Sequence, residues 1–199
     1  ELGFFNNDLT LSLDYFVKKN VDLLAQIDLN LSSGQIFEIN SSREKPYVNT
    51  ASVKNTGWEF MMNYRKQLTK DFHIDATFNI ATLKNKVLSL GENVQPITSG
   101  AMSSYFNDAA SITMPGEAIG SFYGYKIDGF DAEGNFIFAD TDKNGVVNAN
   151  DKVILGSPIP DFTYGLNINM EYKDFDLTVF FQGVQGNDIF NQKKYTYYF

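Results

Sequence analysis

Six residues that can offer oxygen ligands recur at fixed spacing in one short segment. In DTDKNGVVNAND, residues 140–151, positions one, three, five, seven, nine and twelve are Asp140, Asp142, Asn144, Val146, Asn148 and Asp151. This is the spacing of a twelve-residue calcium loop, in which Gly145 takes the sharp turn and Val146 offers its backbone carbonyl. Calcium prefers about six to eight oxygen ligands. The segment therefore predicts a structural, not a catalytic, calcium ion.

Two features of this segment depart from the EF-hand pattern. Position twelve is Asp151, whose side chain is one methylene shorter than the usual Glu and reaches the ion less easily. The flanking stretches, GNFIFA and KVILG, have the composition of strands rather than helices. A turn rich in Asp, Asn and Gly that binds no ion is the alternative interpretation.

The sequence contains few residues that could catalyse a reaction, and we expect that the protein is not an enzyme. His73 is the only histidine, and the sequence has neither cysteine, nor a nucleophile elbow, nor a glycine-rich phosphate loop. No two carboxylates stand out as a glycosidase pair. The aromatic residues of SFYGY, residues 121–125, could stack on a sugar, although packing of the loop on itself is the favoured alternative.

The composition excludes several other classes of protein. The 199 residues carry a net charge of −8, and Lys and Arg are scattered, so a nucleic-acid-binding surface is not expected. No apolar run is long enough for a transmembrane helix, whereas the strands of a transmembrane barrel need only about 9–11 residues. The chain starts at Glu1 without a signal peptide, so we expect a mature protein or a fragment.

Strand patterns dominate the remaining sequence. Residues 162–172 place apolar or aromatic side chains at every even position and small or polar ones between them, and residues 175–183 resume the pattern after a two-residue turn. The even set is Phe162, Tyr164, Leu166, Ile168, Met170 and Tyr172. Because successive side chains in a strand point to opposite faces, this hairpin has one large apolar face and one polar face. A strand between lipid and a watery lumen has this pattern.

Three earlier strands show the same alternation, near residues 9–19, 57–67 and 72–82. We expect long loops over residues 20–56 and 84–161, the second of which contains the calcium-type segment. With strands running up and down, all tight turns then fall at one end and all long loops at the other, as in bacterial outer-membrane barrels. The predicted fold is an all-β, antiparallel, up-and-down transmembrane β-barrel segment with long extracellular loops.

Several stretches resemble one family, the SusC/RagA-type TonB-dependent outer-membrane transporters of Bacteroidetes, in the C-terminal part of their barrel. The stretches are residues 6–24, 53–60, 81–91, 116–130 and 154–191, the last reading ILGSPIPDFTYGLNINMEYKDFDLTVFFQGVQGNDIFN. The resemblance covers nearly the whole chain. The Asp140, Asp142, Asn144 and Asp151 pattern is also similar to this family.

The resemblance implies a large plugged barrel of about 22 strands, a lid formed by a SusD-like surface lipoprotein, and uptake of oligosaccharides or peptides driven by TonB. It also implies a location in the Gram-negative outer membrane. The plug domain, the TonB box and several further strands are not in this sequence, so we expect a fragment that does not transport by itself. The alternative is a soluble secreted calcium-stabilised binding module, dockerin-like or carbohydrate-binding, although dockerins flank such loops with helices.

Overall fold

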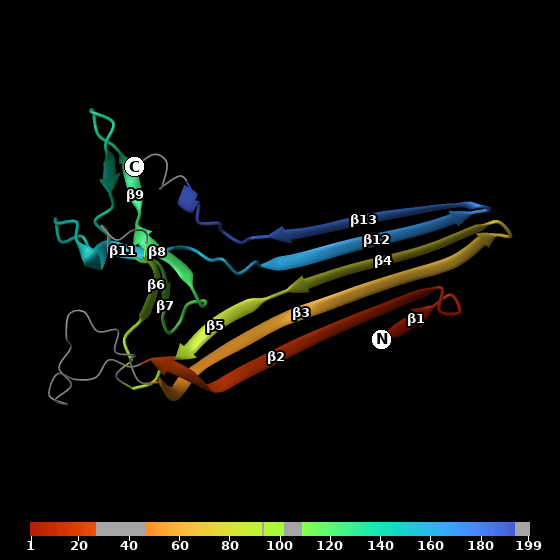
Figure 1. Cartoon of the computed structure of the whole chain (residues 1–199), viewed down its shortest axis with the longest axis horizontal. Coiled ribbons are helices and arrows are strands. Elements are labelled where there is room, and N and C mark those ends of the chain that lie inside the picture. The colour runs from red at the N-terminus through yellow and green to blue at the C-terminus, as the bar shows by residue number, and fades with distance from the viewer. Residues whose placement is uncertain (27–46, 93, 102–108, 194–199) are drawn as a thin grey trace. The chain divides into compact units, whose positions relative to one another are not determined.

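The computed structural model describes residues 1–26, 47–92, 94–101 and 109–193, and these form antiparallel sheets (Figure 1). The main sheet has the order β1-β2-β3-β4-β12-β13, and β5 also pairs with β3. Its strands are β1 (Leu2–Phe4), β2 (Leu9–Gln26), β3 (Tyr47–Thr69), β4 (Phe72–Thr82), β5 (Lys84–Ser89), β12 (Phe162–Tyr172) and β13 (Phe175–Gln185). When the short strands β5 to β11 are left aside, neighbours in this sheet follow one another in the sequence, as an up-and-down arrangement requires.

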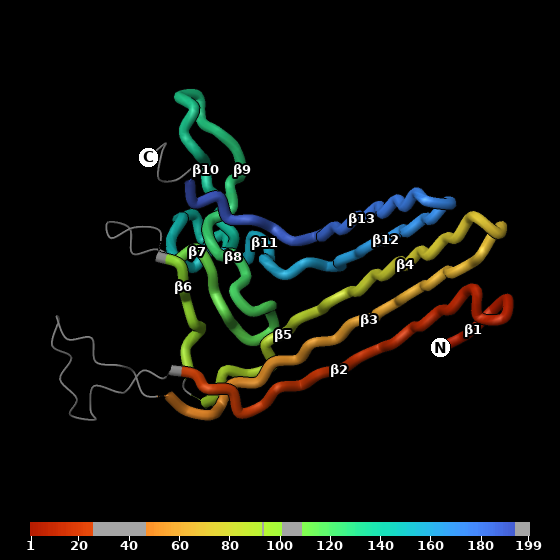
Figure 2. The backbone as a smooth tube through the Cα atoms, turned by 45° about the vertical axis from the view of Figure 1, so that its right-hand side comes forward, coloured from red at the N-terminus to blue at the C-terminus, as the bar shows by residue number. Residues whose placement is uncertain are grey.

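The described residues divide into two compact units, and the first consists of the long strands. It comprises Glu1–Lys18, Asn55–Lys84 and Ile159–Asn187. Figure 2 shows the β1–β2, β3–β4 and β12–β13 connections at the same end of these strands. Two of these turns are in contact, because the Lys173 amide donates to the Asp71 carbonyl at 2.9 Å. The tight turns thus gather at one end of the sheet.

Strand register gives the sheet of the first unit two chemically distinct faces. Leu166 lies opposite Phe78 of β4 and Phe181 of β13, while its neighbour Asn167 lies opposite Thr77 and Phe180. The even positions of β12 continue as an apolar face across β4 and β3. The members on β3 and β4 are Phe60, Met62, Tyr64, Ile74, Ala76, Phe78 and Ile80.

No layer of the first unit covers this apolar face. None of the buried hydrophobic residues that the structure describes belongs to that unit, and Leu177 and Phe181 of β13 are 55% and 58% exposed. A soluble β-sandwich buries one face of each sheet against the other. The sheet therefore presents a broad apolar surface that something outside the unit must cover.

The second unit contains two smaller sheets. One has the order β11-β8-β7-β6, and the other is the hairpin β9–β10. Their bounds are β6 (Ile97–Ala101), β7 (Ala109–Thr113), β8 (Ser121–Tyr125), β9 (Ile127–Phe130), β10 (Phe136–Phe138) and β11 (Lys152–Gly156). A short 3-10 helix, η2 (Ala149–Asp151), precedes β11. Among the described residues, a buried apolar cluster lies in this unit and consists of Ala25, Ala51, Val53, Val87 and Leu90.

Both predicted long loops need correction. The first was expected over residues 20–56, but β2 continues to Gln26 and β3 already begins at Tyr47; residues 27–46 lie outside the described residues. Ala51 and Val53 at the start of β3 are buried and have odd numbers, whereas the odd residues farther along β3 lie on its polar face. The alternation of apolar and polar positions is therefore reversed within this strand. The second, over residues 84–161, contains β5 to β11, whose three to six residues are too few to show a period.

Phe16 interrupts the polar alternation of β2 because it covers a glycine. A Cβ placed on Gly57 would overlap with the Thr82 carbonyl oxygen and lie 2.7 Å from the Phe16 ring. Glycine at position 57 therefore lets this ring and the β4 backbone approach closely.

No helix among the described residues is long and apolar enough to cross a membrane.

Candidate functional site

The predicted calcium segment is a compact loop held by its own side chains. Asp151 is fully buried, and its Oδ1 accepts from the amides of Thr141 at 2.7 Å and Asp142 at 3.3 Å and from the Thr141 hydroxyl at 3.3 Å. Its Oδ2 accepts from the Asn148 amide at 2.8 Å. The last residue of the motif thus closes the loop onto its beginning.

Asp140 and Asp142 fold the first half of the loop around Gly145. The Asp140 carboxylate accepts from the amides of Asn144 at 3.1 Å and Gly145 at 2.7 Å. Asp142 accepts from the amide and side-chain nitrogens of Asn144 at 3.0 and 2.8 Å. Gly145 has φ of 87°, a left-handed conformation that glycine adopts without steric cost. These bonds turn the chain so that acidic side chains face a common point.

Carboxylate oxygens of Asp140, Asp142 and Asp151 lie within 4.8 Å of one another. Asn144 donates and accepts within the loop, its Oδ1 receiving the Val146 amide at 2.8 Å. Asn148 donates to the Val146 carbonyl at 3.1 Å and caps η2 by accepting from the Asn150 amide at 2.9 Å. The side-chain oxygens of Asn144 and Asn148 and the Val146 carbonyl each accept one of these bonds and keep a second lone pair for an ion, so the donor set fits calcium. Asp151 Oδ2 accepts one hydrogen bond and is better placed to bind the ion than Oδ1, which accepts three.

The amides around Asp151 also affect its acidity. The Asn148 amide is the largest influence that lowers the Asp151 pKa below its ordinary value, and the amides of Asp142 and Thr141 act in the same direction against the effect of burial. A carboxylate that receives several N–H donors is stabilised in its charged form. The charged form is also the one that binds a cation, so the loop geometry favours the ion-binding state.

A second carboxylate organises the β9–β10 hairpin. Asp131 accepts from the amides of Glu133 at 3.0 Å and Asn135 at 2.7 Å, and from the Asn135 side chain at 2.9 Å. The side-chain bond from Asn135 is the first cause of an Asp131 pKa lowered below its ordinary value. These contacts fix a turn at the tip of a hairpin that exposes several aromatic rings.

This arrangement predicts the acid response of the hairpin. A carboxylate with a depressed pKa stabilises the folded hairpin above its unfolded pKa of about 3.9, and this contribution disappears only as pH falls through the lower folded value. Amide-exchange protection of residues 127–138 is therefore expected to persist at pH 4 and to fall at more acidic pH. Asp131→Ala should remove the protection already at pH 7, and the matched control Glu133→Gln should not. Equal protection in Asp131→Ala and the unmodified protein at pH 7 would contradict this assignment.

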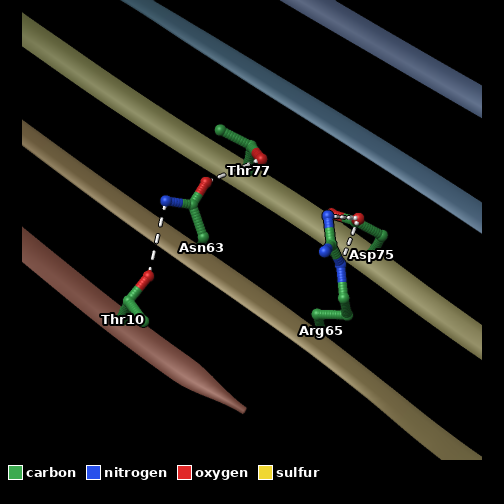
Figure 3. Close-up of polar contacts among 5 residues, drawn as sticks. All are labelled: Thr10, Asn63, Arg65, Asp75 and Thr77. Atoms are coloured by element: carbon green, nitrogen blue, oxygen red, sulfur yellow. Dashed lines mark hydrogen bonds and ion pairs between the residues drawn. The ribbon is translucent and has the colours of Figure 1, made fainter. Parts of the chain in front are cut away.

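The polar face of the first unit carries cross-strand hydrogen bonds (Figure 3). Asn63 of β3 donates to Thr10 of β2 at 3.5 Å and accepts from the Thr77 hydroxyl of β4 at 2.9 Å, linking three strands. Nearby, Arg65 pairs with Asp75 at 2.7 Å. Sequence patterns placed these residues on a polar face but did not reveal the pairs, because pairing depends on strand register. His73 lies opposite Gln67 and Glu171 on this face, as the alternation predicts.

No family model matches the chain, but curated proteins with related sequences exist. TonB-dependent receptor P3 of Formosa agariphila is 35% identical over 96% of the chain and 20% of the receptor. TonB-dependent receptor SusC of Bacteroides thetaiotaomicron is 30% identical over 89% of the chain and 18% of the receptor. The chain thus spans about a fifth of the length of the curated relatives it matches.

Solved structures share the fold. The RagAB peptide transporter superposes with a TM-score of 0.67 and 21% identity over 92% of the chain, which corresponds to 20% of that structure's chain. The RagAB peptide importer in its open-open state gives a TM-score of 0.73 and 21% identity over 93% of the chain and 19% of its own. The prediction of an all-β, antiparallel segment of a β-barrel is confirmed.

Proposed function

Because the chain is homologous to part of the SusC/RagA-type TonB-dependent receptors, we propose that it forms a stretch of the barrel wall of an outer-membrane nutrient importer. The observation that carries this proposal is the sheet of the first unit, with its uncovered apolar face on one side and hydrogen-bonded polar residues on the other. In the proposed importer, the apolar face contacts lipid and the polar face lines the lumen.

The proposed cargo is an oligosaccharide or a peptide, captured together with a SusD-like lipoprotein and admitted in a TonB-driven step. Similarity in sequence to SusC supports the lipoprotein partner, and similarity to receptors named TonB-dependent supports TonB as the energy source. Similarity of fold to the RagAB peptide importer makes peptides a reasonable cargo to test alongside glycans. The long segments that connect the strands at the end opposite the tight turns would meet the cargo and the lipoprotein.

A structural calcium ion in the loop of residues 140–151 completes the proposal. The donor set supports it, because three carboxylates converge and Gly145 provides the sharp turn. The ion would neutralise these carboxylates and stabilise a loop among the segments proposed to face the cargo. It would take no part in chemistry, and the proposed importer is not an enzyme.

Uptake by cells that carry or lack the protein tests this function. Deletion of its gene is expected to abolish growth on one particular glycan or peptide source, and affinity capture of the protein from detergent-solubilised outer membrane should recover a surface lipoprotein. Restoration of growth by the intact gene in cells that contain TonB, but not in cells that lack TonB, would identify energised import. Recovery of the protein in the soluble fraction without detergent would refute the proposal.

A further inference from the structure

One open cleft of the first unit lies at the edge of the apolar face, at the end of the strands away from the tight turns. It has a volume of about 470 Å³ and is lined by Tyr15, Thr56, Gly57, Trp58, Thr82, Leu83, Lys84 and Asp161. Two aromatic residues, one leucine, two threonines, one glycine, one lysine and one aspartate line it, so its wall combines apolar and polar groups.

The aromatic wall of the cleft is a preorganised ring pair. The rings of Tyr15 on β2 and Trp58 on β3 are 4.7 Å apart between centroids and tilted by 46°. The Trp58 backbone amide donates to the Thr82 hydroxyl of β4 at 2.9 Å, which ties the pair to the next strand. Even so, Trp58 and Tyr15 remain 51% and 55% exposed. Amphipathic rings with this exposure are typical of the boundary between membrane and water.

A single cation stands beyond the rings. Lys84 is exposed, and the structure gives its ammonium group no ion pair with the residues it describes. Asp161 is the one acidic residue that lines the cleft. Its carboxylate lies against the backbone of Gly186, in the space that a side chain at position 186 would occupy. Its backbone is likewise engaged, accepting from the Leu83 amide at 3.1 Å and donating to the Gln185 carbonyl at 2.9 Å. An unpaired positive charge therefore follows directly after an apolar, aromatic surface.

We propose that this cleft binds a phosphate-bearing membrane lipid, with its acyl chains against Tyr15 and Trp58 and its phosphate at Lys84. The inference rests on the proposed function, because the cleft continues the face that would contact lipid. Charge complementarity selects an anionic headgroup, since the lysine is the only cation lining the cleft. Free phosphate would lack the contacts with the rings, so the occupant is a lipid and not the inorganic ion.

Native mass spectrometry of the detergent-solubilised protein, titrated with phosphatidylglycerol, tests this inference. The unmodified protein should retain phosphatidylglycerol in preference to diacylglycerol, and millimolar-range inorganic phosphate should not compete. Lys84→Gln should weaken retention about fivefold, the effect of one lysine at a charged lipid surface. Lys84→Arg should preserve it, and Lys126→Gln, which removes an exposed lysine outside the cleft, should leave it unchanged. Trp58→Ala should weaken retention of both lipids.

The outcomes separate this inference from the proposed function. If Lys84→Gln retains phosphatidylglycerol as well as the unmodified protein does, the lipid site is rejected while the membrane importer stands. If the protein is soluble and monodisperse without detergent, both fail. Heat-dependent electrophoretic mobility, which reports a folded barrel, verifies that each variant is folded. If Lys84→Gln does not fold, equal retention of phosphatidylglycerol and diacylglycerol by the unmodified protein rejects the lipid site.

Discussion

Leu166→Arg is expected to destabilise the membrane-folded protein by roughly 2–4 kcal/mol, whereas Asn167→Arg, one residue farther, is expected to have a much smaller effect. Leu166 lies at mid-strand in β12 between Phe78 and Phe181, so an arginine there would place a charge among the apolar side chains that we propose contact lipid. Asn167 lies between Thr77 and Phe180 on the polar face, where a guanidinium group could remain hydrated.

The free energy of unfolding of both variants can be measured by denaturant titration in lipid vesicles. The two substitutions introduce the same side chain at adjacent positions of one strand, so each is the matched control of the other. Equal losses of stability would show that the two faces of β12 meet similar surroundings, and the assignment of lipid and lumen faces would be wrong.

Asp140→Ala is expected to weaken calcium binding by on the order of 10–100-fold or more, since loss even of residues that only support a metal ligand costs this much. Asp140 is the first ligand of the loop and also holds the amides of Asn144 and Gly145, so its removal affects both the ion and the turn. For the unmodified loop, an affinity on the order of 10⁻⁴–10⁻³ M is expected, as for extracellular calcium modules.

Amide exchange of residues 139–152, measured with and without calcium, reports on this loop separately from the rest of the protein. Calcium should slow exchange in the unmodified protein, and Asp140→Ala should need a far higher concentration for the same effect. Asp128→Ala, which removes an exposed carboxylate outside the loop, serves as the control. If saturating calcium leaves the exchange of the unmodified loop unchanged, this segment is a turn that binds no ion.

The long strands could be predicted from sequence because each presents different surroundings on its two faces. The alternation in Phe162–Tyr172 extends over 11 residues, and the register then places the apolar positions side by side across β4, β12 and β13. The compact turn of residues 140–151 could likewise be expected, since its fixed spacing is a local property, and calcium binding there stays a prediction. The closure of this turn by Asp151 through four donated hydrogen bonds could not be expected, because this depends on how the residue is buried.

The strands that sequence patterns did not predict lack one face that stays buried, or apolar, along their whole length. The apolar side chains of β3 occupy odd positions at Ala51 and Val53 but even positions at Phe60 and Met62, so no single period describes the strand. The strands between residues 84 and 161 are short, and pairs such as Ser111 with Phe122 arise only when distant segments meet. The ring pair of Tyr15 and Trp58 and the Arg65–Asp75 ion pair depend on register in the same way.

The central claim is that the even residues of β12 face lipid and the odd residues face water. Single cysteines introduced one at a time at positions 162–172 test it most directly, because the chain contains no cysteine of its own. In native outer membrane, a membrane-impermeant thiol reagent applied to both sides should label the odd positions, and a lipid-soluble quencher should reach the even ones. Uniform labelling along the strand, or protection of the even positions from both reagents, would contradict the account and favour a closed soluble core.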